Sequence, residues 1–189
     1  ALCAELHVPV IARGRGTTTT GASGPVAGDS GVSCERMDRI IEVDHDDRVA
    51  VVESGVLNGD LQVAAARHGL FWAPDPTSAP FCTVGGNLAC NAGGPRAVKY
   101  GATRDNTLAL RCVDGRGVVH RLGSRTTKGA TGYDLMRLVI GSEGTLALIG
   151  EATLKLLPQP EAVRTLRALY RDVASAAAAV ARLMRQPQV

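Results

Sequence analysis

Apolar and β-branched residues gather along the chain in short runs that turn-forming residues separate. Residues 35–44 (ERMDRIIEVD) and 48–55 (RVAVVESG) are rich in Ile and Val and flank an acidic turn, so they predict two strands with a hairpin-like connection. A second, clearer hairpin is predicted for 107–113 and 118–122, because the Asp-Gly pair between them supplies the positive φ that tight turns require. Residues 145–157 predict a long apolar strand that a single glycine interrupts.

Two helical segments precede the middle of the chain. Residues 1–6 read as the last turns of a helix that leads into a strand at 8–12, so we expect the chain to be part of a longer protein. Residues 58–68 predict an amphipathic helix, with Asn58 or Asp60 as its N-cap.

A proline-rich segment separates that helix from the next. The three prolines within 73–80 (APDPTSAP) exclude regular structure there. Thr83 is then placed to cap a short helix through 84–92, which the following Gly-Gly-Pro ends. Another short helix is predicted at 133–139.

A Pro-Gln-Pro tripeptide marks a boundary near the end of the chain. Beyond it, 162–170 predicts a strand and 174–185 an amphipathic helix. We therefore expect one domain over 1–158 and the start of a second over 159–189.

The bulk composition narrows the class of protein. Of the 189 residues, 45% are apolar and 21% charged, which is typical of a globular chain and not of a disordered one. A net charge of +3, with two Phe, three Tyr and one Trp, gives neither the basic surface nor the stacking side chains of a nucleic-acid-binding protein. No apolar run is long enough to predict a membrane-spanning helix.

Cysteine usage indicates a reducing compartment. The five cysteines are odd in number, widely spaced and never in a Cys-x-x-Cys pair, which argues against a disulfide framework and against a zinc site. We expect a cytoplasmic protein without a metal centre, with peripheral association with the inner membrane as an alternative.

One stretch carries the strongest chemical signal. Residues 12–24 (ARGRGTTTTGASG) contain four glycines, four consecutive threonines and two arginines. Glycine at this density lets the backbone turn through positive φ and approach a ligand closely, and consecutive amides and hydroxyls can donate to an anion. The stretch therefore predicts a phosphate-binding loop, with a flexible surface loop as the plain alternative.

Two familiar phosphate loops fit it poorly. The dinucleotide turn Gly-x-Gly-x-x-Gly would use Gly14 and Gly16, but Thr19 stands where the third glycine belongs and no helix follows. The P-loop of nucleotide triphosphatases would use Gly16 and Gly21, but Ala22 stands in place of the lysine that neutralises the phosphates.

A third design becomes visible from four motifs read in order. PVIARGRGTTTTGAS, ERMDRIIEVD, APDPTSAPFCTVGGNLACNAGGPRAVKYG and GYDLMRLVIGSEGTLALIGEATLKLLPQP together resemble the FAD-binding domain of the vanillyl-alcohol oxidase and p-cresol methylhydroxylase flavoproteins. Within that superfamily the chain is most similar to the FAD-linked subunit of glycolate oxidase and to D-lactate and D-2-hydroxyacid dehydrogenases. The resemblance runs from about Val8 to Pro160. It implies an α+β fold, a two-subdomain FAD-binding domain of the p-cresol methylhydroxylase type over 1–158, followed by the start of a cap domain.

The resemblance also implies which residues bind FAD, and it sorts them by the part of the cofactor that they meet. The pyrophosphate is expected to be bound by Arg13, Gly14, Arg15, Gly16, Thr17 and Thr18, and the flavin ring is expected to lie beside Pro74, Asp75, Pro76, Thr77 and Ser78. The helix and turn that wrap the cofactor are expected to contribute Thr83, Gly85, Gly86, Asn87, Asn91, Gly93 and Gly94. The adenosine half is expected to be enclosed by Glu143, Gly144 and Ile149.

Attachment of the cofactor is expected to be non-covalent. Some members of the family link FAD to a histidine in the first loop, and this loop has threonines instead. Some use a cysteine near Cys82 for a second link, but the spacing from Cys82 to Thr83 differs by one. The sequence also departs from the commoner pattern at Ala147 and Gly150, where glycine and threonine are expected, and this lowers the precision of the expected contacts near the adenine.

The implied activity is FAD-dependent oxidation of a 2-hydroxy acid, of the glycolate or D-lactate type, to the 2-oxo acid. No catalytic residue is assigned in this chain, because its four histidines are scattered and the base of the relatives comes mostly from the cap domain. An iron–sulfur or other electron-transfer subunit is an expected partner. Two alternatives remain: a non-catalytic flavin-binding electron-transfer subunit, and a same-fold enzyme acting on a sugar, another alcohol or an ether lipid.

Overall fold

The computed structural model describes residues 2–186, and the chain divides into two compact units, Ala1–Gln159 and Pro160–Val189. The second unit contains one helix, α6 (Val173–Leu183). In chain order the first unit contains α1 (Leu2–Glu5), β1 (Val10–Arg13), β2 (Ser30–Ser33), β3 (Ile40–Asp44), β4 (Val49–Glu53), α2 (Asn58–Ala66), β5 (Leu70–Phe71), α3 (Val84–Cys90), α4 (Ala97–Tyr100), the 3-10 helix η1 (Thr103–Asn106), β6 (Thr107–Asp114), β7 (Val119–Gly123), α5 (Leu135–Val139), β8 (Ala147–Lys155) and β9 (Leu157–Pro158).

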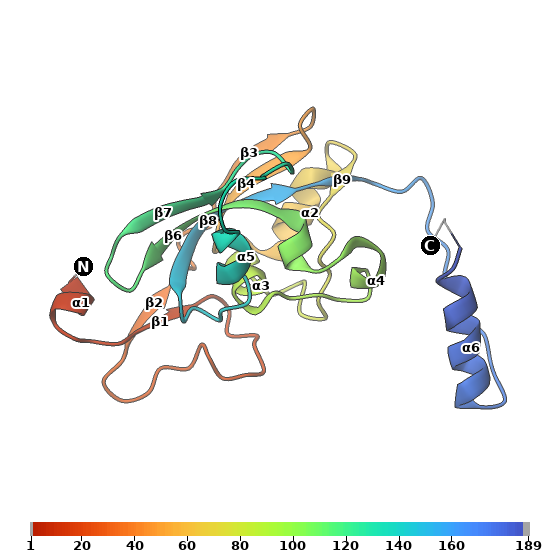
Figure 1. The fold of residues 1–189 in the computed structure, drawn as a ribbon, viewed down its shortest axis with the longest axis horizontal. Helices are drawn as coiled ribbons and strands as arrows, with labels where there is room; N and C mark the ends of the chain where they lie inside the picture. The colour runs from red at the N-terminus through yellow and green to blue at the C-terminus, as the bar shows by residue number, and fades with distance from the viewer. Residues whose placement is uncertain (1, 187–189) are drawn as a thin grey trace. The chain divides into compact units, whose positions relative to one another are not determined.

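A five-stranded antiparallel sheet in the order β3-β4-β8-β6-β7 forms the centre of the first unit (Figure 1). Both predicted hairpins, β3–β4 and β6–β7, are confirmed. The predicted long strand becomes β8, which pairs with β4 on one side and β6 on the other, and the short β9 that pairs with β5. Strand β8 is thus the central strand that unites the two hairpins.

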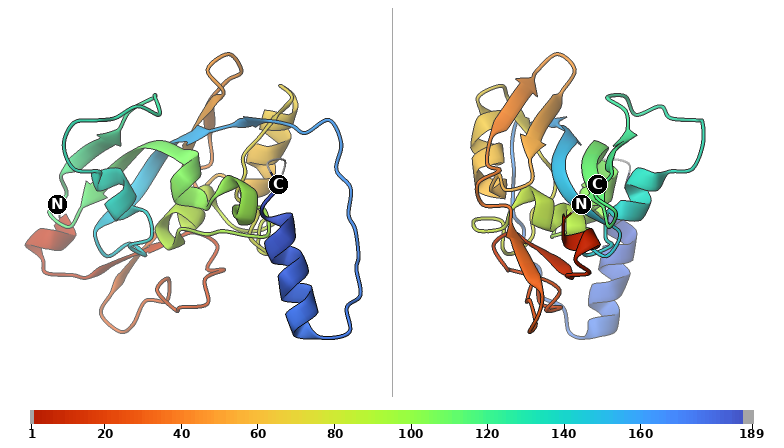
Figure 2. Two further views of the ribbon diagram at one scale, coloured as in Figure 1. Left: turned by 45° about the vertical axis from the view of Figure 1, so that its right-hand side comes forward. Right: turned by 90° about the vertical axis from the view of Figure 1, so that its left-hand side faces the viewer.

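A separate two-stranded sheet carries the glycine-rich segment. Strands β1 and β2 run parallel, with Val10 opposite Ser30 and Arg13 opposite Ser33. Because parallel neighbours cannot be joined by a tight turn, residues 14–29 cross over as a long connection, which Figure 2 shows as an extended loop.

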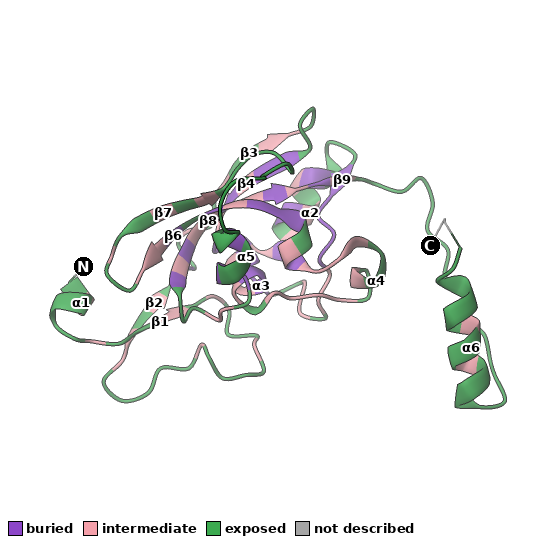
Figure 3. Ribbon diagram, viewed as in Figure 1, coloured by how far each residue is buried: buried purple, intermediate pink, exposed green. Residues whose placement is uncertain are grey.

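Helices α2, α3 and α5 supply the apolar partners for one face of the large sheet. Buried residues concentrate on β4, β8, α2 and α3, whereas no residue of α1 or α6 is buried (Figure 3). The core joins sheet and helix side chains, among them Ala50, Val52, Leu61, Val84, Leu88, Leu110, Met136, Ile140, Ala152 and Leu154. Truncating any of the larger ones is expected to cost about 2–5 kcal/mol of stability.

Helix α2 begins without the predicted side-chain cap. Its N-cap is Leu57, and neither Asn58 nor Asp60 caps it. The buried Asn58 amide instead donates to the Pro74 carbonyl oxygen over 3.1 Å. The Asn58 side chain, predicted to cap α2, therefore binds a carbonyl group that is distant in sequence. This bond holds the proline-rich segment against α2.

The predicted start of α3 is confirmed, but the helix ends earlier than predicted. The Thr83 hydroxyl accepts from the Gly86 N–H over 3.1 Å, as an N-cap does. The helix stops at Asn91, which adopts the left-handed conformation with φ 49°, two residues before the predicted glycine pair.

The predicted strand at 162–170 is wrong. That segment has no regular structure and is exposed along its length, because no strand of the described residues pairs with it. The predicted helix after it is confirmed as α6, whose N-cap Asp172 accepts from the Ser175 N–H over 2.7 Å.

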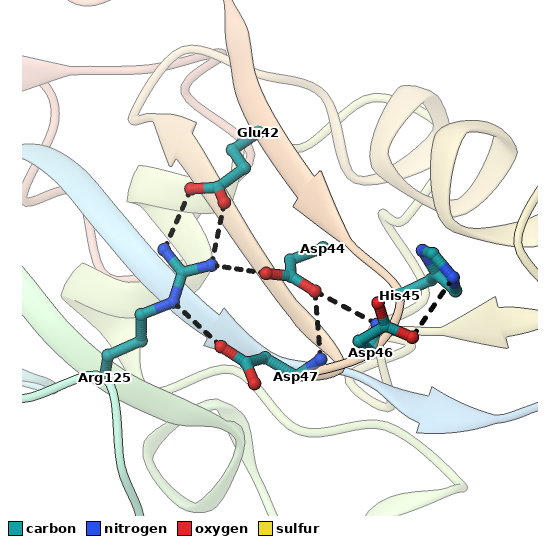
Figure 4. A network of polar contacts seen from close by, with 6 residues as sticks. All are labelled: Glu42, Asp44, His45, Asp46, Asp47 and Arg125. Atoms are coloured by element: carbon teal, nitrogen blue, oxygen red, sulfur yellow. Dashed lines mark hydrogen bonds and ion pairs between the residues drawn. The ribbon is translucent and has the colours of Figure 1, made fainter.

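An ion-pair network ties the loop after β7 to the β3–β4 hairpin (Figure 4). The Arg125 guanidinium contacts Glu42 at 2.7 Å, Asp44 at 3.0 Å and Asp47 at 3.5 Å. Its hydrogen bond lowers the pKa of Glu42, while the pKa of Asp44 is lowered first by the Asp47 backbone N–H. The network therefore joins the two outer strands of the sheet through their connections.

The β6–β7 turn gives a pH-dependent test of the fold. Asp114 accepts from the backbone N–H groups of Arg116 and Val118 and contacts His120 Nε2 at 3.0 Å. The His120 contact first, and the backbone bonds next, lower the pKa of Asp114 to about 2. Because the folded pKa lies below the usual value, this carboxylate stabilises the fold fully above about pH 4 and loses its effect as the pH falls toward 2.

We expect Asp114→Ala to lower the melting temperature at pH 5–7, with the difference from the unmodified protein narrowing between pH 4 and pH 2. Thermal unfolding at a series of pH values checks this. Arg116→Ala is the matched control, because it keeps the backbone N–H that Asp114 uses. A difference that stays constant down to pH 2 would contradict the assigned role of the charge.

Candidate functional site

A cavity of about 370 Å³ lies where the glycine-rich loop faces α3 and the start of β8. All six loop residues predicted for the pyrophosphate line it, together with part of α3 and the turn that precedes β8. The cavity is lined by Ala12, Arg13, Gly14, Arg15, Gly16, Thr17, Thr18, Thr19, Thr20, Ala22, Ser23, Cys34, Ser54, Ser78, Thr83, Gly85, Gly86, Asn87, Ala89, Cys90, Ala92, Glu143, Gly144, Ala147 and Ile149.

The loop lies close against the first turn of α3. A Cβ on Gly14 would overlap the Thr83 hydroxyl, so only glycine allows this approach. Gly16 has φ +65°, and a Cβ there would lie 3.0 Å from the Arg13 guanidinium. Both glycines are therefore required by the backbone path, and the loop residues from Arg13 to Thr20 line the cavity.

A second close contact, between Gly85 and Ser54, forms another part of the cavity lining. A Cβ on Gly85 would lie 2.6 Å from the Ser54 Cβ and 2.7 Å from the Ser54 carbonyl oxygen. The Gly85 N–H donates to that same oxygen over 2.8 Å. The first turn of α3 is thus fixed to the end of β4, and Ser54 and Asn87 become part of the lining.

The turn before β8 reaches across to the loop. Glu143 has φ 52°, an uncommon conformation for a residue with a side chain, and its N–H donates to the Ala89 carbonyl oxygen over 2.8 Å. Its carboxylate accepts a hydrogen bond of 2.7 Å from the Thr20 hydroxyl. We call this contact the Thr20–Glu143 clasp; it joins segments 123 residues apart in the sequence.

Charge in the lining is sparse and hydroxyl groups are abundant. Arg13, Arg15 and Glu143 are the charged side chains among the lining residues, beside eight Ser and Thr hydroxyls. Arg15 lies 3.6 Å from Glu35, which offsets part of its charge. Polar recognition in this cavity therefore depends mainly on neutral hydrogen-bonding groups.

Several predicted residues lie outside the lining. These are Pro74, Asp75, Pro76, Thr77, Asn91, Gly93 and Gly94. Asp75 accepts from the Arg96 N–H over 3.1 Å, and a Cβ on Gly94 would overlap Asp75. Asn91 accepts from the Arg104 N–H over 2.9 Å. In the structure Asp75, Gly94 and Asn91 hold the segments that border the cavity.

Five further lining residues, Ala12, Thr19, Thr20, Ala22 and Ser23, lie in the stretch 12–24 that was predicted as a phosphate-binding loop but were not assigned individually. Six others were not found from the sequence: Cys34, Ser54, Ala89, Cys90, Ala92 and Ala147. Thr19 and Thr20 had a visible signal, since they continue the threonine run. Ser54 had none, because a single serine after a strand belongs to no motif.

The cysteines and the acidic groups limit the chemistry. Cys82 is buried and is not among the lining residues, whereas Cys34 and Cys90 are. Over residues 2–186 no group of three or more His, Cys, Asp or Glu side chains is placed to hold a metal ion. Within the same residues no helix is both long and apolar enough to cross a membrane.

Comparison with known proteins defines the class. Residues 1–123 match the FAD binding domain family, and this is more than half of the chain. The chain belongs to that family, and the α+β fold class predicted from the sequence is confirmed by the match and by the similar solved structures.

Individual relatives narrow the comparison. The chain is 42% identical to the glycolate oxidase subunit GlcD of Bacillus subtilis over 179 residues, which cover 95% of this chain and 38% of the relative. It is 45% identical over 155 residues to a D-lactate dehydrogenase of Archaeoglobus fulgidus, covering 82% and 34%. A solved alkyldihydroxyacetonephosphate synthase superposes with a TM-score of 0.73 at 30% identity, over 85% of this chain and 31% of that one. The chain thus spans well under half the length of these relatives.

The Thr20–Glu143 clasp gives the first test of the site. Because one neutral-to-charged hydrogen bond anchors the loop to the turn, we expect Glu143→Ala to raise amide hydrogen exchange in residues 17–23 roughly two- to tenfold. Glu143→Gln, which keeps an acceptor oxygen, is expected to preserve most of the protection. Equal exchange in all three proteins would show that the clasp does not hold the loop.

Proposed function

We propose that the cavity binds FAD non-covalently, with its pyrophosphate on the loop Arg13–Thr18. The observation that carries this proposal is that one cavity is lined both by the glycine-rich loop and by the residues of two buried polar atoms, Ser54 Oγ and Asn87 Nδ2, that have no hydrogen-bond partner in the protein. Family membership supplies the identity of the cofactor.

The residues present fit this group. Glycines at positions 14, 16 and 85 allow the close packing that forms the cavity lining, and the threonine hydroxyls offer donors to phosphate oxygens. Ala147 and Ile149 give an apolar wall next to Glu143 and Gly144, where we place the adenosine half. We place the flavin ring beyond Ser78, along Pro74–Thr77 and the turn at Gly93 and Gly94.

Non-covalent attachment is supported by the lining itself. No histidine lines the cavity within the described residues, and Cys82 lies outside the lining. We therefore expect acid to release all of the flavin from the purified protein.

A backbone variant tests FAD binding directly. The purified full-length protein is expected to be yellow, with a flavin absorption spectrum that matches FAD after acid release. Gly16→Val should abolish flavin retention, because a β-branched residue is strained at φ +65° and its side chain would meet Arg13.

Gly115→Val is the matched control, since the positive φ of the β6–β7 turn falls at Gly117 (φ 84°) and not, as predicted, at Gly115, and a Cβ at Gly115 meets no heavy atom within 4 Å. It should retain the flavin. A colourless wild-type protein that takes up no added FAD would overturn the proposal, and full occupancy in Gly16→Val would show that the loop does not bind the cofactor.

For the full-length protein we propose FAD-dependent oxidation of a 2-hydroxy acid to the 2-oxo acid. The support is the similarity to relatives named as glycolate oxidase subunit and D-lactate dehydrogenase. FAD, when bound, supplies a two-electron acceptor that takes a hydride equivalent. The substrate loses a hydride from C2 and a proton from its hydroxyl group, so the C2–H bond breaks and a carbonyl forms.

This chain's share in that reaction is binding and orientation. Its loop, α3 and the turn before β8 hold the cofactor, and we expect the base and the groups that bind the substrate carboxylate in the remaining part of the full-length protein. We propose the cytoplasm as its location, consistent with five free cysteines, and a partner subunit that accepts the electrons, because one relative is named as a subunit.

Anaerobic reduction tests the substrate class. Mixing the full-length flavoprotein with glycolate or D-lactate, without oxygen, should bleach the flavin absorption near 450 nm, while L-lactate and simple alcohols should react at least tenfold more slowly. Stopped-flow absorbance measures this. A flavoprotein that no 2-hydroxy acid reduces, but that a sugar or another alcohol does, would replace this substrate class by the same-fold alternative.

A further inference from the structure

We propose that Ser54 is a further cofactor-binding residue, whose hydroxyl hydrogen-bonds an oxygen of the bound dinucleotide next to the Asn87 amide. This inference rests on the proposed binding of FAD. It concerns a residue that lies outside the four sequence motifs and that is placed in the site by its tertiary contacts.

The argument begins with the buried polar residues of the described chain. There are seven: Ser54, Asn58, Thr83, Asn87, Thr103, Asn106 and Thr107. Five of them have a side-chain hydrogen bond inside the protein. In the other two, Ser54 and Asn87, a buried side-chain oxygen or nitrogen has no hydrogen-bond partner, and both residues line the cavity.

This distribution indicates a ligand. A buried hydroxyl or amide without a partner is destabilising, and folded proteins avoid it except where a ligand, a water molecule or a functional need accounts for it. Ser54 is 1% exposed and Asn87 is 3% exposed, so neither side chain is solvated at the outer surface. Ser54 Oγ and Asn87 Nδ2 both belong to residues that border this cavity, whereas the third buried side-chain atom without a partner, Arg104 Nε, belongs to a half-buried residue outside the lining.

The hydroxyl of Ser54 is also held in place by its backbone. Its N–H donates to the Gly150 carbonyl oxygen over 3.0 Å, and its carbonyl oxygen accepts from the Gly85 N–H over 2.8 Å. Both backbone groups are thus used within the protein, and the side chain has freedom only about χ1. A preorganised donor of this kind loses little entropy when it binds.

The position relative to α3 points to the polar middle of the dinucleotide. Ser54 contacts Gly85, and Thr83, two residues earlier, contacts Gly14 of the loop assigned to the pyrophosphate. Ser54 and the loop therefore meet the same turn of α3. The acceptor is an oxygen of the pyrophosphate or of the adjoining ribityl chain.

The test compares Ser54→Ala with the wild-type full-length protein in two measurements. The dissociation constant for FAD, measured by titrating the flavin-free protein, is expected to rise about three- to tenfold, because one hydrogen bond is lost. The melting temperature of the flavin-free variant is expected to be equal to or higher than that of the wild type, because an unpartnered buried hydroxyl has been removed. A serine with a structural role would lower it.

Ser30→Ala in β2, outside the cavity lining, is the matched control and should change neither quantity. A second titration with ADP separates the two acceptors: a similar loss of ADP affinity in Ser54→Ala assigns the pyrophosphate, and a loss confined to FAD and FMN assigns the ribityl chain.

The two proposals fail differently. Wild-type protein that binds no FAD overturns the proposed function. Wild-type protein that binds FAD while Ser54→Ala binds it equally well, or melts at a lower temperature without its flavin, overturns the role of Ser54 alone.

Discussion

The first turn of α3 contacts two other parts of the chain at distances that only glycine allows, and the site depends on this packing. Gly85 lies against Ser54 at the end of β4, and Gly14 lies against the Thr83 hydroxyl at the start of the helix. The same hydroxyl caps the helix by accepting from the Gly86 N–H. Helix capping, attachment to the sheet and placement of the loop are therefore coupled in one turn.

The coupling explains how a loop without buried apolar side chains keeps a defined path. Residues 14–29 bury none of their side chains, so hydrophobic packing cannot hold them. Their ends are held by the parallel pair β1–β2, their first residues by the contact with Thr83, and their middle by the Thr20–Glu143 clasp. The loop is positioned by steric fit and by hydrogen bonds, which explains why its sequence is rich in glycine and threonine.

Much of the fold was predictable from local pattern, and the failures share one cause. The hairpins and the Thr83 cap depend on residues close in sequence, so periodicity and turn chemistry found them. The predicted Asn58 cap was wrong because the helix already includes Asn58, with Leu57 at the N-cap, and the Asn58 amide donates to the Pro74 carbonyl oxygen, sixteen residues away. The predicted strand at 162–170 was wrong because a strand needs a neighbour, and its β-branched residues cannot show whether one exists.

The residues of the candidate site likewise divide into those that the sequence predicts and those that only the tertiary structure reveals. The glycine-rich loop was visible as composition, and motif resemblance added α3 and the turn at Glu143. Ser54 was invisible, because its importance comes from the contact with Gly85 and from a hydroxyl left without a partner, both of which are tertiary properties. Asp75 and Gly94 were visible in the motif, but the structure shows them packed on each other beside the cavity.

The sparse charge of the lining decides how such a cavity can hold an anionic cofactor. Arg13 and Arg15 are the cations of the lining, and Glu143 and the nearby Glu35 oppose them, so little net positive charge faces the cavity. Under the proposed binding of FAD, the diphosphate is held mainly by oriented neutral donors, namely backbone amides, threonine hydroxyls and the Ser54 and Asn87 groups. Such donors act at short range and are weakly screened by salt, but they lose their effect when displaced by a fraction of an ångström. In the proposed complex, the packing of the first turn of α3 positions these donors in place of the lysine that a P-loop uses, which accounts for the glycine-rich composition of residues 12–24.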